Sequence, residues 1–321
     1  MAIKPLAGNP KDGEIVVHVR DAIDAEPMEI KNLLLNLSTE LGTSIYWRQL
    51  DADTGALIDK ISNAIHIIRH KTQFNQRNAI NLMPAYLDGF WYFDPKGDRA
   101  NSTIATARYS AGEISQPSAL QYFDELADRY IPTNRSKFEQ MARENDGIAN
   151  NALVVPLQRF DPPSRGEHHA TMLELIHHTI ANRGERPVFL KPHPNQRVEE
   201  LVEIVKFHDP ENGIEVIHRS IHDLLDGAHA IVTLSSAVGF EAMLHKTPSI
   251  LLGDTDFHHQ AVPLKSLDRL GSIINSIDPS NFDYPAYLYW FCHLNLLDTQ
   301  HPAAFLTKAK AVLLAQGLIS S

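Results

Sequence analysis

The second half of the chain alternates short apolar runs with amphipathic segments. The apolar runs are rich in branched residues and predict buried strands at 152–156, 187–191, 213–218, 228–234 and 248–253. Apolar residues between these runs predict helices at 167–181, 197–207, 220–226 and 239–245. Ser220 and Asp223 also match the pattern of a capping box at a helix start. Strands that alternate with helices predict a doubly wound α/β domain.

The first half repeats this alternation. Branched apolar runs predict strands at 14–19, 44–48, 64–69 and 79–83. Leu33, Leu37 and Leu41 lie at helical spacing between Pro27, which suits a first helical turn, and Gly42, which suits a helix end. We therefore expect a second α/β domain, with a parallel sheet and helices on both of its faces.

Two less regular stretches separate these patterns. Residues 94–118 lack apolar periodicity and are rich in Gly, Ser, Asn and Pro, which predicts a long loop or a small irregular insertion. Residues 139–151 are polar, and we place a domain boundary there, between 148 and 149. The resulting domains, 1–148 and 149–321, have ordinary sizes. The end of the chain, from Tyr287 on, predicts two further helices.

The charge balance argues against nucleic acid as a main partner. The chain has 29 Lys and Arg against 39 Asp and Glu, a formal net charge of −10, whereas phosphate backbones are bound by an excess of cations. No apolar run approaches the roughly 20 residues that span a bilayer, and the first residues lack the apolar core of a secretory signal. The single cysteine, Cys292, suits a reducing compartment. We therefore expect a cytoplasmic protein.

The histidines raise the question of a metal site, because 12 of the 17 lie between residues 165 and 260. They include three adjacent pairs, which start at His168, His177 and His258. None of these pairs has the spacing of a known zinc motif. We therefore expect no metal site and place most of these histidines on helix surfaces.

Polar side chains follow each predicted strand of the second half, where ligands of open α/β sheets bind. In strand order, these side chains are Gln158 and Asp161, then His193 and Asn195, then His218 and Ser220, then Ser235 and Ser236, and finally Asp254, Asp256 and His258. Because the carboxyl ends of parallel strands meet at one edge, the sequence predicts a binding site along this edge of the sheet.

Three local patterns supply candidate chemistry at this edge. Ser235 and Ser236 precede a helix start and would suit a phosphate or carboxylate, although serine is also an ordinary helix cap. Gly239 allows close packing behind them. Glu241 follows one turn later and is either a buried acceptor for two ribose hydroxyls or a solvated helix residue. In Lys191-Pro192-His193-Pro194 the two prolines fix the backbone around His193, which serves either a nucleotide or a simple turn.

A fourth pattern lies in the first half. Asp88 stands between apolar residues and before Gly89. A semi-buried carboxylate of this kind has a raised pKa and can act as a general base. Asp-Gly is, however, also one of the commonest turn dipeptides.

On these residues, the chain resembles the capsule polysaccharide biosynthesis proteins and their relatives, the bacterial Kdo transferases. The resemblance covers roughly residues 85–257 and is strongest in the second half. Its pieces, in family order, are Leu87-Asp88-Gly89-Phe90, the segment 136–140, Gln158 with Asp161 and Ser164, Lys191-Pro192-His193-Pro194, and Ser235-Ser236 with Gly239 and Glu241. Leu87 departs from the family pattern, which often has a second acidic residue before the Asp-Gly pair.

The resemblance implies a GT-B-like fold, with two Rossmann-like domains facing a cleft and C-terminal helices that cross back to the first. It implies a CMP-activated sugar donor, held mainly by the C-terminal domain without a metal or other cofactor. His193 and Pro194 would hold the nucleotide, Ser235 and Ser236 the phosphate, and Glu241 the ribose. Gln158, Lys191, Ser220 and Gly239 complete the expected nucleotide site. Asp88 would be the catalytic carboxylate, with Asp161 as the second candidate.

The sequence therefore predicts a glycosyltransferase that moves a sugar, most simply Kdo, to a glycan acceptor in capsule or lipopolysaccharide biosynthesis. Peripheral association with an inner-membrane assembly machinery fits this role. Two alternatives stay open. The first is a polyol-phosphate transferase with a CDP-activated donor, and the second is a non-catalytic subunit that binds a nucleotide or glycan, as the departure at Leu87 would allow.

Overall fold

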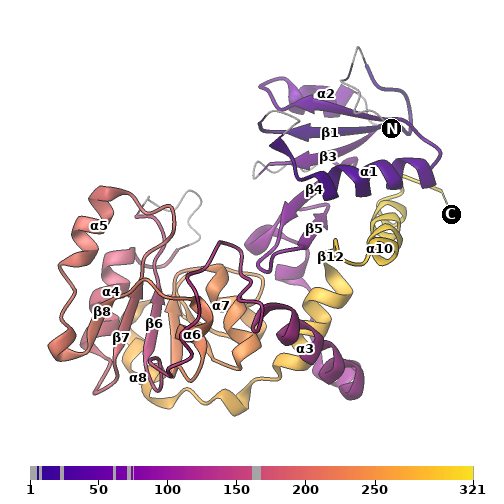
Figure 1. Ribbon diagram of the computed structural model, residues 1–321. Coiled ribbons are helices and arrows are strands. Elements are labelled where there is room, and N and C mark those ends of the chain that lie inside the picture. Colours follow the sequence, from indigo (N-terminus) through magenta and orange to yellow (C-terminus); the bar gives the residue numbers. More distant parts are fainter. Residues whose placement is uncertain are drawn as a thin grey trace. The chain divides into compact units, whose positions relative to one another are not determined.

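A computed structural model describes residues 6, 9–21, 25–60, 63–70, 74, 76–160 and 168–320. The chain forms two compact units (Figure 1). The first contains Met1–Ala85, Gly89–Ala107 and Phe291–Ser321, and the second contains Tyr86–Asp88 and Arg108–Trp290. Among the described residues, each unit is built on a six-stranded sheet flanked by helices. The predicted α/β fold class is therefore confirmed.

The sheet of the first unit is parallel at its centre and antiparallel at one edge. Its strands are β1 (Ile15–Val19), β2 (Ile45–Gln49), β3 (Ile65–Arg69), β4 (Ala79–Pro84), β5 (Phe90–Asp94) and β12 (Leu297–Asp298). They lie in the order β12-β5-β4-β3-β1-β2, and β5 and β12 run antiparallel to their neighbours. The prediction of a parallel sheet is wrong at this edge, because a short turn returns the chain directly from β4 to β5.

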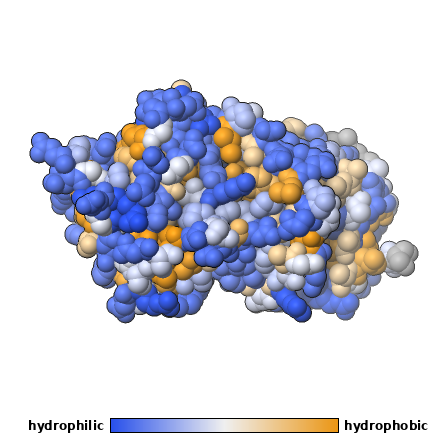
Figure 2. All heavy atoms as spheres, turned by 90° about the horizontal axis from the view of Figure 1, so that it is seen from below, coloured by the Kyte–Doolittle hydropathy of each residue, from blue (hydrophilic) through white to orange (hydrophobic). Residues whose placement is uncertain are grey.

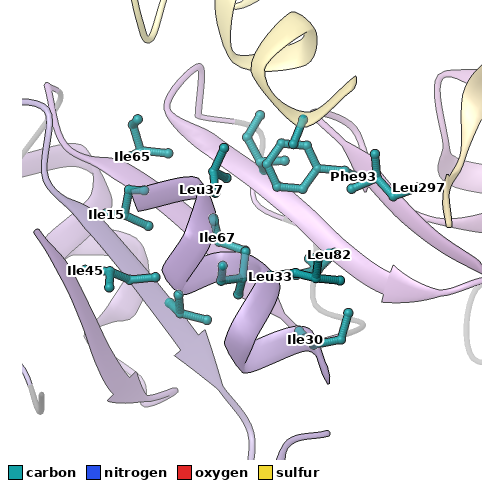
Figure 3. Close-up of a cluster of buried hydrophobic side chains, with 14 of the residues drawn as sticks. Ile15, Ile30, Leu33, Leu37, Ile45, Ile65, Ile67, Leu82, Phe93 and Leu297 are labelled. Carbon is teal, nitrogen blue, oxygen red and sulfur yellow. The ribbon is translucent and has the colours of Figure 1, made fainter. Parts of the chain in front are cut away.

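Helices cover both faces of this sheet. α1 (Met28–Glu40) and α10 (Pro302–Ala315) pack on one face, and α2 (Thr54–Lys60) packs on the other. Figure 3 shows Leu33 and Leu37 of α1 among the strand side chains of this core. As expected, α1 ends where Gly42 adopts a φ of 63°. The C-terminal helix α10 returns to the first unit, as the family resemblance implied.

The sheet of the second unit is entirely parallel over its described pairs. Its strands are β6 (Leu153–Pro156), β7 (Val188–Lys191), β8 (Ile214–Val216), β9 (Ala230–Thr233), β10 (Ser249–Leu251) and β11 (Val262–Pro263). They lie in the order β11-β10-β9-β6-β7-β8. The five strands predicted for this half are therefore present, each somewhat shorter than its apolar run.

Helices also cover both faces of the second sheet. α4 (Met172–Ala181), α5 (Val198–Val205) and α8 (Leu270–Ser276) pack on one face. α6 (Ile221–Leu225) and α7 (Ala237–Glu241), which continues as a 3-10 helix through His245, pack on the other. Each helix thus buries an apolar face against the sheet, which makes this unit a doubly wound α/β domain.

The compact units divide the chain at places other than the predicted boundary between 148 and 149. α3 (Gln116–Tyr130), which sequence patterning missed, packs against α9 (Tyr284–Leu288), so residues 108–148 belong to the second unit. The polar residues 139–151 that suggested a linker are held by hydrogen bonds within that unit. Residues 94–118 contain three 3-10 turns before α3 begins. A π-helix, Tyr289–Leu294, follows α9.

The outer surface carries the usual mixture of residues. On the face that Figure 2 shows, small apolar patches lie among hydrophilic side chains. Within the described part of the chain, no helix has both the length and the apolar character needed to cross a membrane.

Candidate functional site at the carboxyl ends of the second sheet

The order of the second sheet reverses at β6. From this strand the chain runs outward through β7 and β8, and it then returns to the other side of β6 with β9, β10 and β11. In open α/β sheets, the crevice at such a switch point is the usual ligand site. The carboxyl ends of β6 and β9 therefore mark where a ligand is expected, and Gln158, Ser235 and Ser236 follow these two strands.

Gln158 joins the two strand ends at the switch point. Its side-chain Oε1 accepts a hydrogen bond from the backbone N–H of Ser235 at 3.0 Å, and its Nε2 donates to Ser235 Oγ at 3.4 Å. His168 Nε2 also lies 2.9 Å from Ser235 Oγ. Ser236 caps α7 by accepting from the backbone N–H of Val238 at 3.3 Å. Predicted residues from two strand ends thus form one cluster, to which the structure adds His168.

Gly239 packs closely behind the two serines, as predicted. A Cβ placed on it would meet Phe257 and Thr233 side-chain atoms at 3.4 Å. A Cβ would thus be in contact with both side chains, and a longer side chain would have to displace Phe257 or Thr233. The glycine therefore keeps the serine turn close to the sheet.

The His-Pro turn follows β7 and holds His193 in one orientation. His193 Nδ1 accepts from the backbone N–H of Asn195 at 3.0 Å, so this nitrogen carries no proton. Partial burial, followed by the nearby charge of Arg159, lowers the pKa of His193. The ring is therefore neutral near pH 7, with its Nε2–H able to donate.

Gln196 and Glu200 tie this turn to the end of β6, and sequence patterning missed both of them. Gln196 Nε2 donates to Glu200 Oε2 at 2.5 Å and to the backbone oxygen of Gln158 at 3.4 Å. Glu200 Oε1 accepts from the backbone N–H of Phe160 at 2.9 Å. Gln196 stands directly after the His-Pro-Asn run, which is the signal that could have identified it.

A pocket of about 560 Å³ lies beside the His-Pro turn. One wall comes from the strand ends and α5, with Lys191, Pro192, His193, Pro194, Gln196, Leu201 and His218. The other wall is Phe138, Glu139, Gln140 and Met141. The ring of Phe138 meets the imidazole of His193 edge-on, with ring centroids 5.0 Å apart. Ser235 and Ser236 do not line this pocket. They follow β9, and β6 lies between β9 and β7 in the sheet.

The second wall belongs to a segment that we call the strap, residues 134–146. Asn134 Oδ1 accepts from Ser220 Oγ at 2.6 Å, and Gln140 Oε1 accepts from the backbone N–H of Ile221 at 2.9 Å. Farther along, the Asp223 carboxylate accepts from Arg143 Nε at 3.0 Å. The strap is thus bonded to the start of α6 at several points.

These bonds change the expected role of the Ser220 and Asp223 pair. Ser220 does cap α6, since its Oγ accepts from the backbone N–H of His222 at 3.2 Å. Asp223 does not return a bond to the cap but accepts from the strap, including the backbone N–H of Glu144 at 2.7 Å. The predicted capping box is therefore wrong in its second half. The chain does form a capping box with Thr171 and Glu174 at the start of α4.

Glu241 is deeply buried beside the strap. It is 2% exposed, and its Oε2 accepts from Ser136 Oγ at 2.7 Å. Burial raises the pKa of Glu241 to about 7, against the opposing effects of Ser136, Lys137 and Lys191. Burial also lowers the pKa of Lys191, which donates to the backbone oxygen of Arg219 at 2.5 Å. The acid and the lysine therefore lie close enough to influence each other's charge.

Of the two candidate catalytic carboxylates, Asp88 and Asp161, the structure describes only Asp88. Asp88 occupies the turn between β4 and β5, where Gly89 has a φ of 90°. Its side chain is 51% exposed and pairs with Arg135 at 2.7 Å, so the predicted semi-burial is wrong. The hairpin turn holds this aspartate at the surface, which is why an Asp-Gly signal did not imply burial. Asp161, like Ser164, lies outside the described residues.

Comparisons with known proteins give a family match and a shared fold. A family model described as "Capsule polysaccharide biosynthesis protein" matches residues 98–262, which is just over half of the chain. No curated protein matches the sequence.

The solved structures that share the fold include two from Thermosulfurimonas dismutans KpsC. Its beta Kdo 2,7 transferase is 14% identical, with a TM-score of 0.54, 93% of this chain covered and 99% of the other. Its beta Kdo 2,4 transferase is 16% identical, with a TM-score of 0.51, 79% of this chain covered and 85% of the other. These likenesses agree with the GT-B-like fold that the sequence predicted.

Proposed function

Because this chain belongs to the capsule polysaccharide biosynthesis protein family, we propose that it is a glycosyltransferase that moves Kdo from a CMP-activated donor to a glycan acceptor. The observation that carries this proposal is the pocket at the His-Pro turn. Its volume of about 560 Å³ falls within the usual range for small-molecule sites, roughly 300–1,000 Å³. Its lining combines an aromatic ring, a lysine and neutral hydrogen-bonding side chains. These groups suit the base, the phosphate and the polar atoms of a nucleotide.

In this proposal, the pocket holds the cytidine part of the donor. Phe138 offers a face or edge to the base, and Pro194 closes the apolar side. The neutral His193 donates its Nε2–H to an oxygen of the nucleotide. Lys191 supplies positive charge from the end of β7, toward the phosphate.

The phosphate then lies toward the switch point. The hydroxyls of Ser235 and Ser236 would donate to it, while Gln158 fixes the serine turn. Charge builds on this phosphate as CMP leaves, so donors that are already in place lower the barrier. Ser220 and Gly239 hold α6 and α7 in position around the site.

The acceptor hydroxyl needs a base. We assign this role to Asp88, whose exposed carboxylate is oriented by Arg135, with Asp161 as the second candidate. A positioned carboxylate that removes a proton in the transition state contributes a rate factor on the order of 10² to 10⁴. No step in this scheme uses a metal ion, so we expect transfer to continue in the presence of a chelator.

A donor screen tests the proposal. The purified chain would be incubated with capsule or lipopolysaccharide acceptors and with either CMP-Kdo or CDP-glycerol, and mass spectrometry would follow the product and the released nucleotide. We expect a mass gain of one Kdo and release of CMP, with or without EDTA. Transfer from the CDP-activated donor alone would make the chain a polyol-phosphate transferase. Nucleotide binding with neither hydrolysis nor transfer of any donor would point to a non-catalytic binding subunit, which could act with an inner-membrane assembly machinery.

A further inference from the structure

The carboxylate of Glu241 faces the strap within the second unit. Ser136 Oγ donates to its Oε2 at 2.7 Å, and the backbone N–H of Lys137 donates to the same carboxylate. At 2% exposure, the side chain has almost no contact with solvent. A buried carboxylate is stable only while such donors remain in place. The hydrogen bonds between Glu241 and the strap therefore stabilise both the buried carboxylate and the position of the strap.

This arrangement leaves little room for the ribose contact that the sequence suggested. A ribose hydroxyl that reached Glu241 would have to displace Ser136 and enter a closed site. Glu241 and Ser136 do not line the pocket that is open to ligand, whereas Phe138 and Gln140 of the strap do. The carboxylate thus acts on this pocket through the strap.

The hydrogen bonds to Glu241, which we call the anchor, come from residues directly before the pocket wall in the sequence. Ser136 and Lys137 bind Glu241, and Phe138 is the next residue. Phe138 is 38% exposed, so its own packing does not fix its place. Phe138 is held in place by two hydrogen bonds that flank it in the sequence. One joins Ser136 to Glu241, and in the other Gln140 Oε1 accepts from the backbone N–H of Ile221 at 2.9 Å. Release of the Ser136 anchor would let Phe138 move away from His193.

We propose that Glu241 is a positioning residue, which holds the strap through Ser136 so that Phe138 forms the second wall of the nucleotide pocket. Glu241 then sets the affinity for the nucleotide without touching it. This inference rests on the proposed function, because it assigns the pocket to the cytidine part of the donor. It differs from a ribose-binding role in what it predicts for Ser136.

The test removes the strap's side of the anchor and leaves Glu241 intact. Ser136→Ala should weaken CMP binding, measured by titration calorimetry, by on the order of tenfold, since the hydrogen bond that holds the strap to Glu241 is lost. The backbone amides of residues 137–141 should exchange with deuterium about tenfold faster. Ser136→Thr keeps the hydroxyl and should restore both values. Ser266→Ala is the matched control, because Ser266 also donates to a carboxylate, Asp268 Oδ2 at 3.0 Å, but does not line the pocket.

A second variant, at Glu241, completes a double-mutant cycle with Ser136→Ala. Glu241→Ala should weaken CMP binding by a similar factor, and Ser136→Ala combined with Glu241→Ala should add little to either single change, because both remove one anchor. In steady-state kinetics, Ser136→Ala should raise the donor KM and leave kcat near the wild-type value.

The opposite pattern would overturn the inference. If Glu241 bound the ribose itself, Ser136→Ala would free the carboxylate and leave CMP affinity unchanged or tighter, while Glu241→Ala alone would lose it. Unchanged exchange in the strap of Ser136→Ala would equally contradict the anchor. A wild-type chain that binds no CMP would instead refute the proposed function and the effect on affinity, and the exchange rates would still decide whether Glu241 holds the strap.

Discussion

The ring of Phe138 meets the imidazole of His193 edge-on, with their centroids 5.0 Å apart. One residue comes from the strap and the other from the turn after β7, and both line the same pocket. The strap thus converts an open strand end into a two-walled site. This contact also places an aromatic ring where a nucleobase is expected to lie.

The Phe138 ring should therefore contribute directly to nucleotide affinity. An aromatic ring that stacks on a base contributes about 1–3 kcal/mol, so Phe138→Ala should raise the Kd for CMP by roughly 5- to 150-fold. Phe138→Tyr should keep most of the affinity. Leu120→Ala is the control, because Leu120 is also a partly exposed apolar residue of the second unit but lies outside this pocket. Titration calorimetry gives all four values, and equal affinity for Phe138→Ala and wild type would remove Phe138 from the site.

Asp88 should matter for transfer and not for donor binding. Asp88→Asn should lower kcat by on the order of 10² to 10⁴, because the amide cannot accept the acceptor's proton. CMP affinity should stay within about twofold, and stability should change little, since an exposed ion pair contributes about 0–1 kcal/mol. Asp51→Asn is a matched control, because Asp51 forms an exposed pair with Arg48 in the first unit. Near-normal turnover by Asp88→Asn would move the base to another carboxylate, with Asp161 the next to test.

The buried Glu241 should make stability depend on pH. Its pKa rises from 4.5 to about 7 on folding, so between these values the folded chain binds more protons than the unfolded chain. Stability from this group therefore falls as pH rises through that window, by up to roughly 3 kcal/mol. Glu241→Gln does not titrate and should remove this part of the slope.

Urea unfolding at several values between pH 5 and pH 8 measures the difference between wild type and Glu241→Gln. The wild type should lose stability relative to the variant as the pH rises, and the difference should level off above about pH 8. Because other groups titrate equally in both proteins, the difference isolates Glu241. A constant difference across the range would mean that the carboxyl keeps an ordinary pKa in the folded chain.

The return of the C-terminal helix to the first unit also has a measurable consequence. Phe305 of α10 is 1% exposed and belongs to the core that contains β1 and α1. Phe305→Ala should therefore destabilise the first unit by about 3–5 kcal/mol. Hydrogen exchange should speed up in β1 and β3 but not in β6 and β9. Leu314→Ala, at an exposed position on the same helix, should change neither the stability nor the exchange rates. Exchange in β1 of Phe305→Ala that is as slow as in the wild type would contradict this packing.

Much of the fold follows from local patterns in the sequence. The runs that become β1, β6, β7 and β9 are apolar and branched because these strands are buried on both faces, and such runs are legible without tertiary information. β12 is only two residues long, Leu297–Asp298, and exists because it pairs with β5. No local pattern predicts a strand of this kind. The strap is not predictable from local patterns either, because its polar composition is that of a linker. Its bonding partners lie far away in the sequence, at the start of α6.

The candidate site was predictable to a similar extent. Gln158, His193 and Ser235 are predictable as candidates because parallel strand ends gather at one edge, and the structure places them after the neighbouring strands β6, β7 and β9. Its position one turn into α7 makes Glu241 a candidate, but its hydrogen-bond partner Ser136 lies in the strap, far away in the sequence. A contact of this kind depends on how the chain folds back, so sequence spacing could suggest a buried carboxylate without showing what faces it.

The central claim is that the pocket at the His-Pro turn binds the nucleotide of a CMP-activated donor. Titration of CMP into the wild-type chain, His193→Ala and His178→Ala tests it most directly, because His178 is an exposed histidine of α4 away from the pocket. We predict binding by the wild type and by His178→Ala, and a loss of at least about tenfold for His193→Ala. Equal affinity in all three proteins, or no binding by the wild type, would contradict the claim.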